Sequence, residues 1–121
     1  MIGYITVGTN NMERAAKFYD ELLAEMGAKR AMESDRFVGW SSGEGTPMFM
    51  IIKPADGSDA KPGNGNMVAL AAGSNDKVDS LYAKAISLGG TDEGEPGPRA
   101  GTFYGGYFRD LDGNKFVFFN M

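Results

Sequence analysis

The sequence predicts an α+β fold of two tandem βαβββ modules, which form a curved, mostly antiparallel pair of sheets around a cleft. Three observations carry this prediction. The chain repeats its apolar pattern after 63 residues, each half holds one segment with helical periodicity, and three strand-like segments follow each helix. Two such sheets side by side would leave a concave surface for a ligand.

The repeat places apolar positions of the first half on apolar positions of the second. Ile5, Val7, Ala15, Phe18, Tyr19, Leu22 and Leu23 fall on Val68, Leu70, Val78, Leu81, Tyr82, Ala85 and Ile86. In each half, a short alternating strand therefore precedes a helix with one apolar stripe.

The first module begins with an alternating strand within Met1–Gly8. We expect Asn10 or Asn11 to cap the helix, with Glu13 three residues after Asn10 in a capping-box spacing, and Gly27 to end it. The strands that follow are predicted at Ala28–Glu33, Arg36–Ser41 and Pro47–Ile52.

The second module repeats this order, with Ser74 as the helix cap and Gly89 or Gly90 at the helix end. Its later strands are predicted at Thr91–Glu95, Phe103–Arg109 and Lys115–Asn120, and the Asp110–Asn114 segment is a hairpin turn. The shift grows to 67 here, which places Gly39-Trp40 on Gly106-Tyr107 and Met50 on Val117. A four-residue insertion within the Gly94–Gly101 loop would explain the change.

The length predicts a single domain over residues 1–121, with modules at 1–54 and 66–121 and a linker at 55–65 rich in Gly, Asp, Ser and Pro. No basic leader and no apolar run of about 20 residues is present, so we expect a cytoplasmic protein without a membrane partner. The net charge of −4 and the scattered basic residues argue against nucleic acid as a partner.

The absence of both Cys and His has chemical consequences. Without Cys there are no disulfides, thiolate nucleophiles or Cys-rich zinc sites. Without His the commonest general base and the commonest metal ligand are missing, which also excludes a Ser-His-Asp nucleophile.

Two segments carry a resemblance to a known family. Ile2 to Gly8 followed by Glu13-Arg14-Ala15 and Phe18-Tyr19-Asp20, and Gly106 to Asp110 followed by Asp112 to Lys115, resemble the opening and closing parts of small vicinal oxygen chelate proteins. That superfamily contains glyoxalases, bleomycin-resistance proteins and extradiol dioxygenases. The resemblance implies the paired-module fold, a small-molecule ligand and a homodimer.

The resemblance also locates the four positions at which metal-dependent members carry their ligands. Three of them correspond to Tyr4, Met67 and Val117, where the family has His, His and Glu, and the repeat symmetry places the fourth at Met50; all four depart from the family pattern. A phenol, two thioethers and an alkyl group are poor donors for hard or borderline cations. We therefore predict that no metal and no other cofactor is bound.

Alternation along the strands adds neighbours to this inner surface, and three aromatic residues could also reach it. Arg99, in the predicted inserted loop, could form a bidentate ion pair with a ligand carboxylate. Glu44, Glu93 and Glu95 lie in predicted loops or strand ends that could form the rim of the cleft. The predicted ligand-binding residues are Tyr4, Trp40, Met48, Met50, Met67, Arg99, Tyr104, Tyr107, Val117 and Phe119, with Ile52 on the same side.

Three functions fit this surface, and the sequence leaves them open. The first hypothesis is metal-independent binding and sequestration of a small aromatic or cationic molecule, as in bleomycin-resistance proteins. The second is a glyoxalase-like lyase or isomerase without the usual metal, which would use Tyr4, Tyr104 or Arg99 with a loop carboxylate. The third is a degenerate, non-catalytic interaction module. A further alternative for the surface is that its side chains simply fill the groove.

Overall fold

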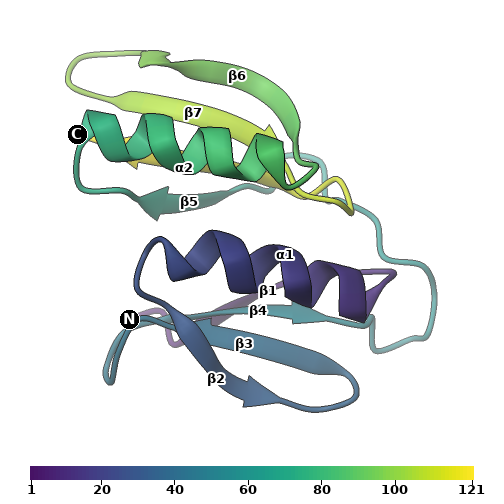
Figure 1. The fold of residues 1–121 in the computed structure, drawn as a ribbon. Helices are drawn as coiled ribbons and strands as arrows, with labels where there is room; N and C mark the ends of the chain where they lie inside the picture. The colour runs from purple at the N-terminus through teal and green to yellow at the C-terminus, as the bar shows by residue number, and fades with distance from the viewer. The chain divides into compact units, whose positions relative to one another are not determined.

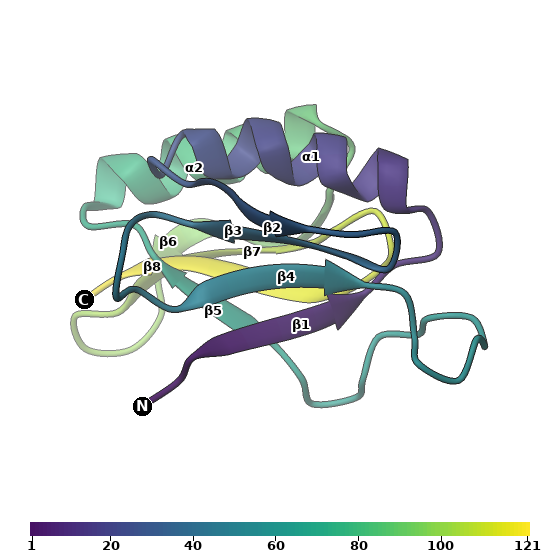
Figure 2. The ribbon, with the colours of Figure 1, turned by 90° about the horizontal axis from the view of Figure 1, so that it is seen from below.

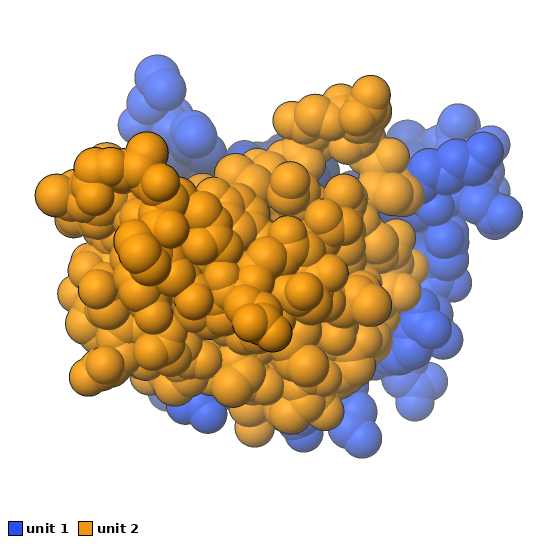
Figure 3. All heavy atoms as spheres, turned by 90° about the horizontal axis from the view of Figure 1, so that it is seen from above, with its two compact units in different colours: residues 1–61 blue, residues 62–121 orange.

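The computed structural model describes residues 1–121. The chain divides into two units, Met1–Lys61 and Pro62–Met121, which are coloured separately in Figure 3. This division lies inside the predicted linker. Each unit is one βαβββ module with its own helix and four-stranded sheet, and each is described by itself.

The first unit places its helix on one face of a mixed sheet, as Figures 1 and 2 show. The strand order is β1-β4-β3-β2, in which β1 runs parallel to β4 and the other neighbours are antiparallel. The elements are β1 (Tyr4–Gly8), α1 (Met12–Ala24), β2 (Lys29–Glu33), β3 (Phe37–Ser41) and β4 (Met48–Ile52).

The second unit repeats this topology with the order β5-β8-β7-β6 and one parallel pair, β5 with β8. The elements are β5 (Val68–Ala71), α2 (Asn75–Ser87), β6 (Thr91–Pro98), β7 (Tyr104–Arg109) and β8 (Lys115–Asn120). The predicted α+β class and the two tandem modules are confirmed. The predicted cleft involves both sheets and remains a prediction, as does the single domain.

Both helices are bounded by the predicted kinds of residue. The side chains of Asn11 and Ser74 accept hydrogen bonds from backbone N–H groups three residues later, at 3.0 and 3.1 Å. Gly27 and Gly89 follow the helices with φ of 76° and 106°, in the left-handed region that favours glycine.

The capping box predicted from Asn10 and Glu13 is wrong. Asn10 is not the helix cap: its side-chain amide donates to the carbonyl of Ala60 and accepts from the Ala60 N–H, at 3.0 and 2.7 Å. Asn10 thus holds the end of the first unit against the start of its helix. The cap falls to Asn11, and position three after Asn11 is an arginine, which cannot complete the box.

Aromatic side chains form much of both cores. In the first unit the Tyr19 ring lies 4.7 Å from that of Phe49 and 5.6 Å from that of Trp40, between α1 and the sheet. In the second unit Phe108 stacks on two rings of β8, each at 5.3 Å. The fully buried large side chains include Trp40, Tyr19, Phe108, Phe116, Phe118, Leu22, Ile51 and Leu81.

The predicted match between the third strands of the two modules is wrong by one residue. Trp40 pairs with Phe49 in the first sheet, and Phe108 pairs with Phe116 in the second, so Trp40 corresponds to Phe108 rather than to Tyr107. The shift at this strand is therefore 68, not 67. Because successive strand residues point to opposite faces, Trp40 lies on the helix side of its sheet and Tyr107 on the uncovered face of the other.

The strand β6 is longer than predicted and irregular. It extends to Pro98, through residues that we expected in the loop, and its pairing with β7 shifts register twice, near Gly94 and Gly97. Glycine in a strand often marks such bulges, because the backbone must leave the regular pleat.

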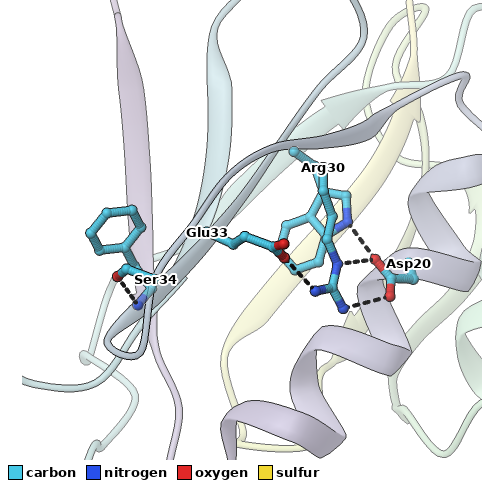
Figure 4. A network of polar contacts seen from close by, with 6 residues as sticks. Asp20, Arg30, Glu33 and Ser34 are labelled. Carbon is cyan, nitrogen blue, oxygen red and sulfur yellow. Dashed lines mark hydrogen bonds and ion pairs between the residues drawn. The ribbon is translucent and has the colours of Figure 1, made fainter.

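A charged network ties α1 to the first sheet, as Figure 4 shows. The Asp20 carboxylate accepts from Nε and Nη2 of Arg30 at 2.9 and 2.7 Å, and from the indole N–H of Trp40 at 3.0 Å. Arg30 also donates to Glu33 at 2.7 Å. The hydrogen bonds from Arg30 hold the pKa of Asp20 below its ordinary value.

We expect Asp20→Asn to lower the free energy of unfolding at pH 7 by about 1 kcal/mol, since the ion pair is partly exposed. A carboxyl whose folded pKa is lowered stabilises the fold above its unfolded pKa, and this contribution is lost as the pH falls through the folded value. The difference between variant and wild type should therefore shrink below about pH 4. Urea unfolding at pH 7 and at pH 3 measures this difference in the free energy of unfolding. Glu21→Gln, at an exposed neighbour, is the control, and an equal loss there would contradict the assignment.

Candidate functional site

The first sheet carries a hollow of about 480 Å³ on the face that α1 leaves uncovered. We call it the unit 1 pocket. The residues that line it come from β1, β2, β3, β4 and the turn before β3: Tyr4, Thr6, Met32, Arg36, Phe37, Met48, Met50 and Ile52. A concave and mainly apolar surface with a few polar groups is typical of small-molecule sites.

Strand alternation explains the centre of this pocket. β1 and β4 are parallel neighbours, with Tyr4 paired to Met48 and Thr6 to Met50. Residues two apart on a strand share a face, so the side chains of Tyr4, Met48, Met50 and Ile52 line the same pocket. This placement was predicted and is confirmed, while their binding of a ligand remains a prediction.

Gly39 of β3 makes room for the two methionines. It pairs with Met50, and a Cβ built on it would lie 2.8 Å from the Met48 sulfur and 3.0 Å from Cγ of Met50. Any larger residue would push these side chains into the hollow. A glycine in the middle of a strand is otherwise unfavourable, so close packing of neighbours accounts for it.

Four lining residues were missed: Thr6, Met32, Arg36 and Phe37. Alternation from Tyr4 predicts Thr6, and alternation from Gly39 predicts Phe37, so the sequence contained enough information to predict both. Met32 follows a register shift in β2, and Arg36 precedes β3, so alternation gave no guide to either. Nε of Arg36 donates to the carbonyl of Lys53 at 3.2 Å, which anchors its guanidinium beside the pocket.

The corresponding uncovered face of the second sheet is more crowded. A Cβ at Gly105 would meet Phe103 at 2.8 Å, Val117 at 3.1 Å and Tyr107 at 3.5 Å. Phe103 also stacks on Phe119, with centroids 5.4 Å apart and rings nearly parallel. Tyr107, Val117 and Phe119 therefore gather on one face as predicted, over a glycine that gives them space.

Arg99 is held in a fixed position on this face. Its guanidinium lies 5.2 Å from the centroid of the Tyr107 ring and donates to the carbonyls of Glu95 and Gly97, at 2.6 and 3.1 Å. A Cβ at Gly94 or at Gly97 would come within 3.2 Å of the guanidinium. The two irregular points of β6 thus accommodate Arg99.

The three rim carboxylates have different surroundings. Glu93 forms an ion pair with Arg109 at 2.8 Å, whereas Glu95 contributes its backbone carbonyl to Arg99. Glu44 is exposed in the turn between β3 and β4. No carboxylate of the three lines the unit 1 pocket.

Two predicted site residues lie on the helix side of their sheets instead. Trp40 is 2% exposed, packs against Tyr19 and donates to Asp20. The hydroxyl of Tyr104 donates to Asp79 of α2 at 2.7 Å, and this hydrogen bond raises the pKa of Tyr104. The expectation that both reach the ligand surface is wrong, because their strand positions alternate with the residues of the uncovered face.

The donor atoms at the four family ligand positions do not fit a divalent metal. Tyr4 and Met50 line the unit 1 pocket; Met67, in the second unit, directly precedes β5, and Val117 is fully buried in β8. They offer a phenol, two thioethers and a hydrocarbon, where such ions need imidazole or carboxylate. No three His, Cys, Asp or Glu side chains of the chain lie grouped as metal ligands.

The paired βαβββ modules, each with an uncovered sheet face, define a class of small α+β proteins. The chain belongs to the Glyoxalase/Bleomycin resistance protein/Dioxygenase superfamily, whose sequence model matches residues 1–118. The recognised fold and family are therefore confirmed. The two helices have 13 residues each, and neither has the length and hydropathy of a membrane span.

Solved structures support the assignment. A glyoxalase/bleomycin resistance protein from Albidiferax ferrireducens T118 is 34% identical, with a TM-score of 0.91 over 100% of this chain and 98% of its own. A hypothetical protein, SA1046, from S. aureus is 29% identical, with a TM-score of 0.79 over 98% and 92%. A glyoxalase-like protein from Bacillus halodurans shares the fold at 20% identity, with a TM-score of 0.80 over 98% and 94%. No curated protein matches the chain.

Proposed function

We propose that this protein binds and sequesters a small aromatic molecule without a metal, in the manner of bleomycin-resistance proteins. The observation that carries the proposal is the unit 1 pocket, in which methionine and aromatic side chains surround Tyr4 and Met50, two of the family ligand positions. Thioethers and rings favour flat apolar ligands through dispersion and sulfur–aromatic contacts.

The charge beside the pocket refines the class of ligand. Arg36 is the one ionisable group among its lining residues apart from the Tyr4 phenol. A guanidinium repels a cation and can pair with a carboxylate or sulfonate. We therefore favour a neutral or anionic aromatic molecule over the cationic ligand that the sequence left open.

Sequestration also agrees with the available side chains, because binding needs no general acid or base. The chain has no His, and the Tyr104 hydroxyl is bonded to Asp79 on the helix side. The remaining candidates for the enzyme hypothesis are Tyr4 or Arg99 with a loop carboxylate, and no carboxylate lines the unit 1 pocket that contains Tyr4. No observation favours the lyase or isomerase over the binding protein.

A thermal-melt screen tests the proposal with neutral aromatics, aromatic acids and aromatic quaternary amines. We expect at least one of the first two groups to stabilise the protein, by about 2.7 kcal/mol at 100 times its dissociation constant. Met48→Ala, in the pocket, should reduce that effect, whereas Met121→Ala, at a residue 77% exposed, should not. Nickel, zinc and manganese should leave the melt unchanged. Stoichiometric tight metal binding, or stabilisation by the quaternary amines alone, would contradict the proposal.

The same proposal includes a homodimer in the cytoplasm, which rests on the resemblance to the family. Sedimentation velocity should give twice the 13.0 kDa mass of the chain. A monomeric protein at micromolar concentration would contradict the dimer but not the proposed binding in the unit 1 pocket, which residues of one chain line.

A further inference from the structure

The second unit has a polar hollow of about 570 Å³ that shares no residue with the unit 1 pocket. We call it the unit 2 pocket. It is lined by the Pro62–Met67 segment together with Arg109 and Lys115, from the ends of β7 and β8 that meet at the hairpin turn. No acidic side chain lines it, although the chain as a whole is acidic.

The two cationic side chains of this pocket are Arg109 and Lys115, and only Arg109 has an acidic partner. Nε of Arg109 pairs with Glu93 at 2.8 Å, and its Nη1 donates to the carbonyl of Gly113 at 3.0 Å. Lys115 has no carboxylate partner; its ammonium lies 5.6 Å from the centroid of the Tyr107 ring. One positive charge at the pocket is thus left without a counter-charge.

The facing segment can supply backbone donors. In the Gly63–Asn66 turn the Asn66 N–H donates to the Gly63 carbonyl at 3.2 Å, and Gly65 has a φ of 88°. The N–H groups of Asn64 and Gly65 donate to no other group of the chain, so both are available to a ligand. Consecutive backbone N–H groups in a turn with a left-handed residue form a concavity suited to anions.

Contacts on either side fix the geometry of this turn. A Cβ at Gly63 would collide with the side-chain amide of Asn66, so that amide lies against the glycine. Pro62 lies against Gly113 of the hairpin, where a Cβ would be 3.5 Å from its ring, and Gly113 itself has a φ of 87°. The turn and the hairpin that separates Arg109 from Lys115 are therefore neighbours.

We propose that the unit 2 pocket binds an oxyanion, a phosphate or carboxylate group, between Lys115, Arg109 and the backbone of the Gly63–Asn66 turn. A dianionic phosphate should bind more tightly than a monocarboxylate, because it carries more charge and three acceptor oxygens. This inference goes beyond the sequestration proposed for the unit 1 pocket, and either can fail alone.

Amide NMR spectra of the full chain test the proposal, with inorganic phosphate titrated at constant ionic strength and pH 7. We expect saturable shifts at Asn64 and Gly65, and roughly tenfold weaker binding in Lys115→Gln. Lys115→Arg should retain binding within about threefold, since it keeps the charge. Lys17→Gln, at an exposed residue of α1, removes the same charge far from this pocket's lining residues in the sequence and should leave the affinity unchanged.

Two further titrations, with methyl phosphate and with acetate, distinguish a phosphate ligand from a carboxylate ligand. Methyl phosphate should shift the same amides as phosphate, and acetate should do so more weakly. If acetate binds more tightly, the ligand is a carboxylate and the pocket assignment still holds. Shifts that stay linear to high phosphate, or an affinity unchanged in Lys115→Gln with a native spectrum, would overturn the proposal.

Discussion

Replacement of Phe108 by alanine should lower the free energy of unfolding by about 3–5 kcal/mol, a large part of the stability of a domain of this size. Phe108 is fully buried in β7 and stacks on both Phe116 and Phe118 at 5.3 Å. Its removal loses the transfer free energy of the ring and leaves a cavity that rigid neighbours cannot fill. Urea unfolding followed by far-UV circular dichroism measures the loss.

Phe119→Ala is the matched control, because the residue lies on the same sheet and differs in burial. Phe119 is half-buried on the uncovered face, where it stacks on Phe103. We expect its replacement to cost less than about 2 kcal/mol. If both variants lose equal stability, the core of the second unit does not centre on Phe108.

The order of elements could be predicted because local patterns specify it. The apolar stripes of both helices, their polar caps and the glycines after them agree with one another in each half. The parallel pairing of β1 with β4 follows once a helix connects the first strand to the rest of the sheet. These signals lie within a few residues of each other in the sequence.

The faces of the strands were predicted less well, because a face depends on register. An error of one residue matched Trp40 of β3 to Tyr107 of β7, although Trp40 corresponds to Phe108 and lies on the helix side of its sheet. The end of β6 was also predicted too early, because its pairing with β7 is irregular near Gly94 and Gly97. Side-chain periodicity of two makes every such slip reverse the assignment.

The two pockets show the same limit. Tyr4, Met48, Met50 and Ile52 could be grouped by alternation within two strands, and the structure brings them together. Arg36 joins them from a turn, and the unit 2 pocket combines a linker segment with two strand ends. No short-range pattern connects residues that meet only through the fold.

Replacement of Gly39 by valine should greatly weaken ligand binding in the unit 1 pocket while the fold is retained. The new side chain would overlap the Met48 sulfur and Cγ of Met50, and we expect these flexible side chains to relieve the overlap by moving into the hollow that they line. We expect overpacking to cost about 1–3 kcal/mol, partly offset because valine suits a strand better than glycine.

The aromatic sulfonate 1-anilinonaphthalene-8-sulfonate is a suitable probe, since its rings match the methionine surface and its sulfonate can pair with Arg36. Its saturable fluorescence increase should weaken at least about a hundredfold in Gly39→Val, equivalent to roughly 2.7 kcal/mol. Gly43→Val is the control, because a Cβ there meets nothing within 4 Å. Unchanged affinity in a folded Gly39→Val protein would mean that the probe binds elsewhere, and that Gly39 serves only the packing of β3 against β4.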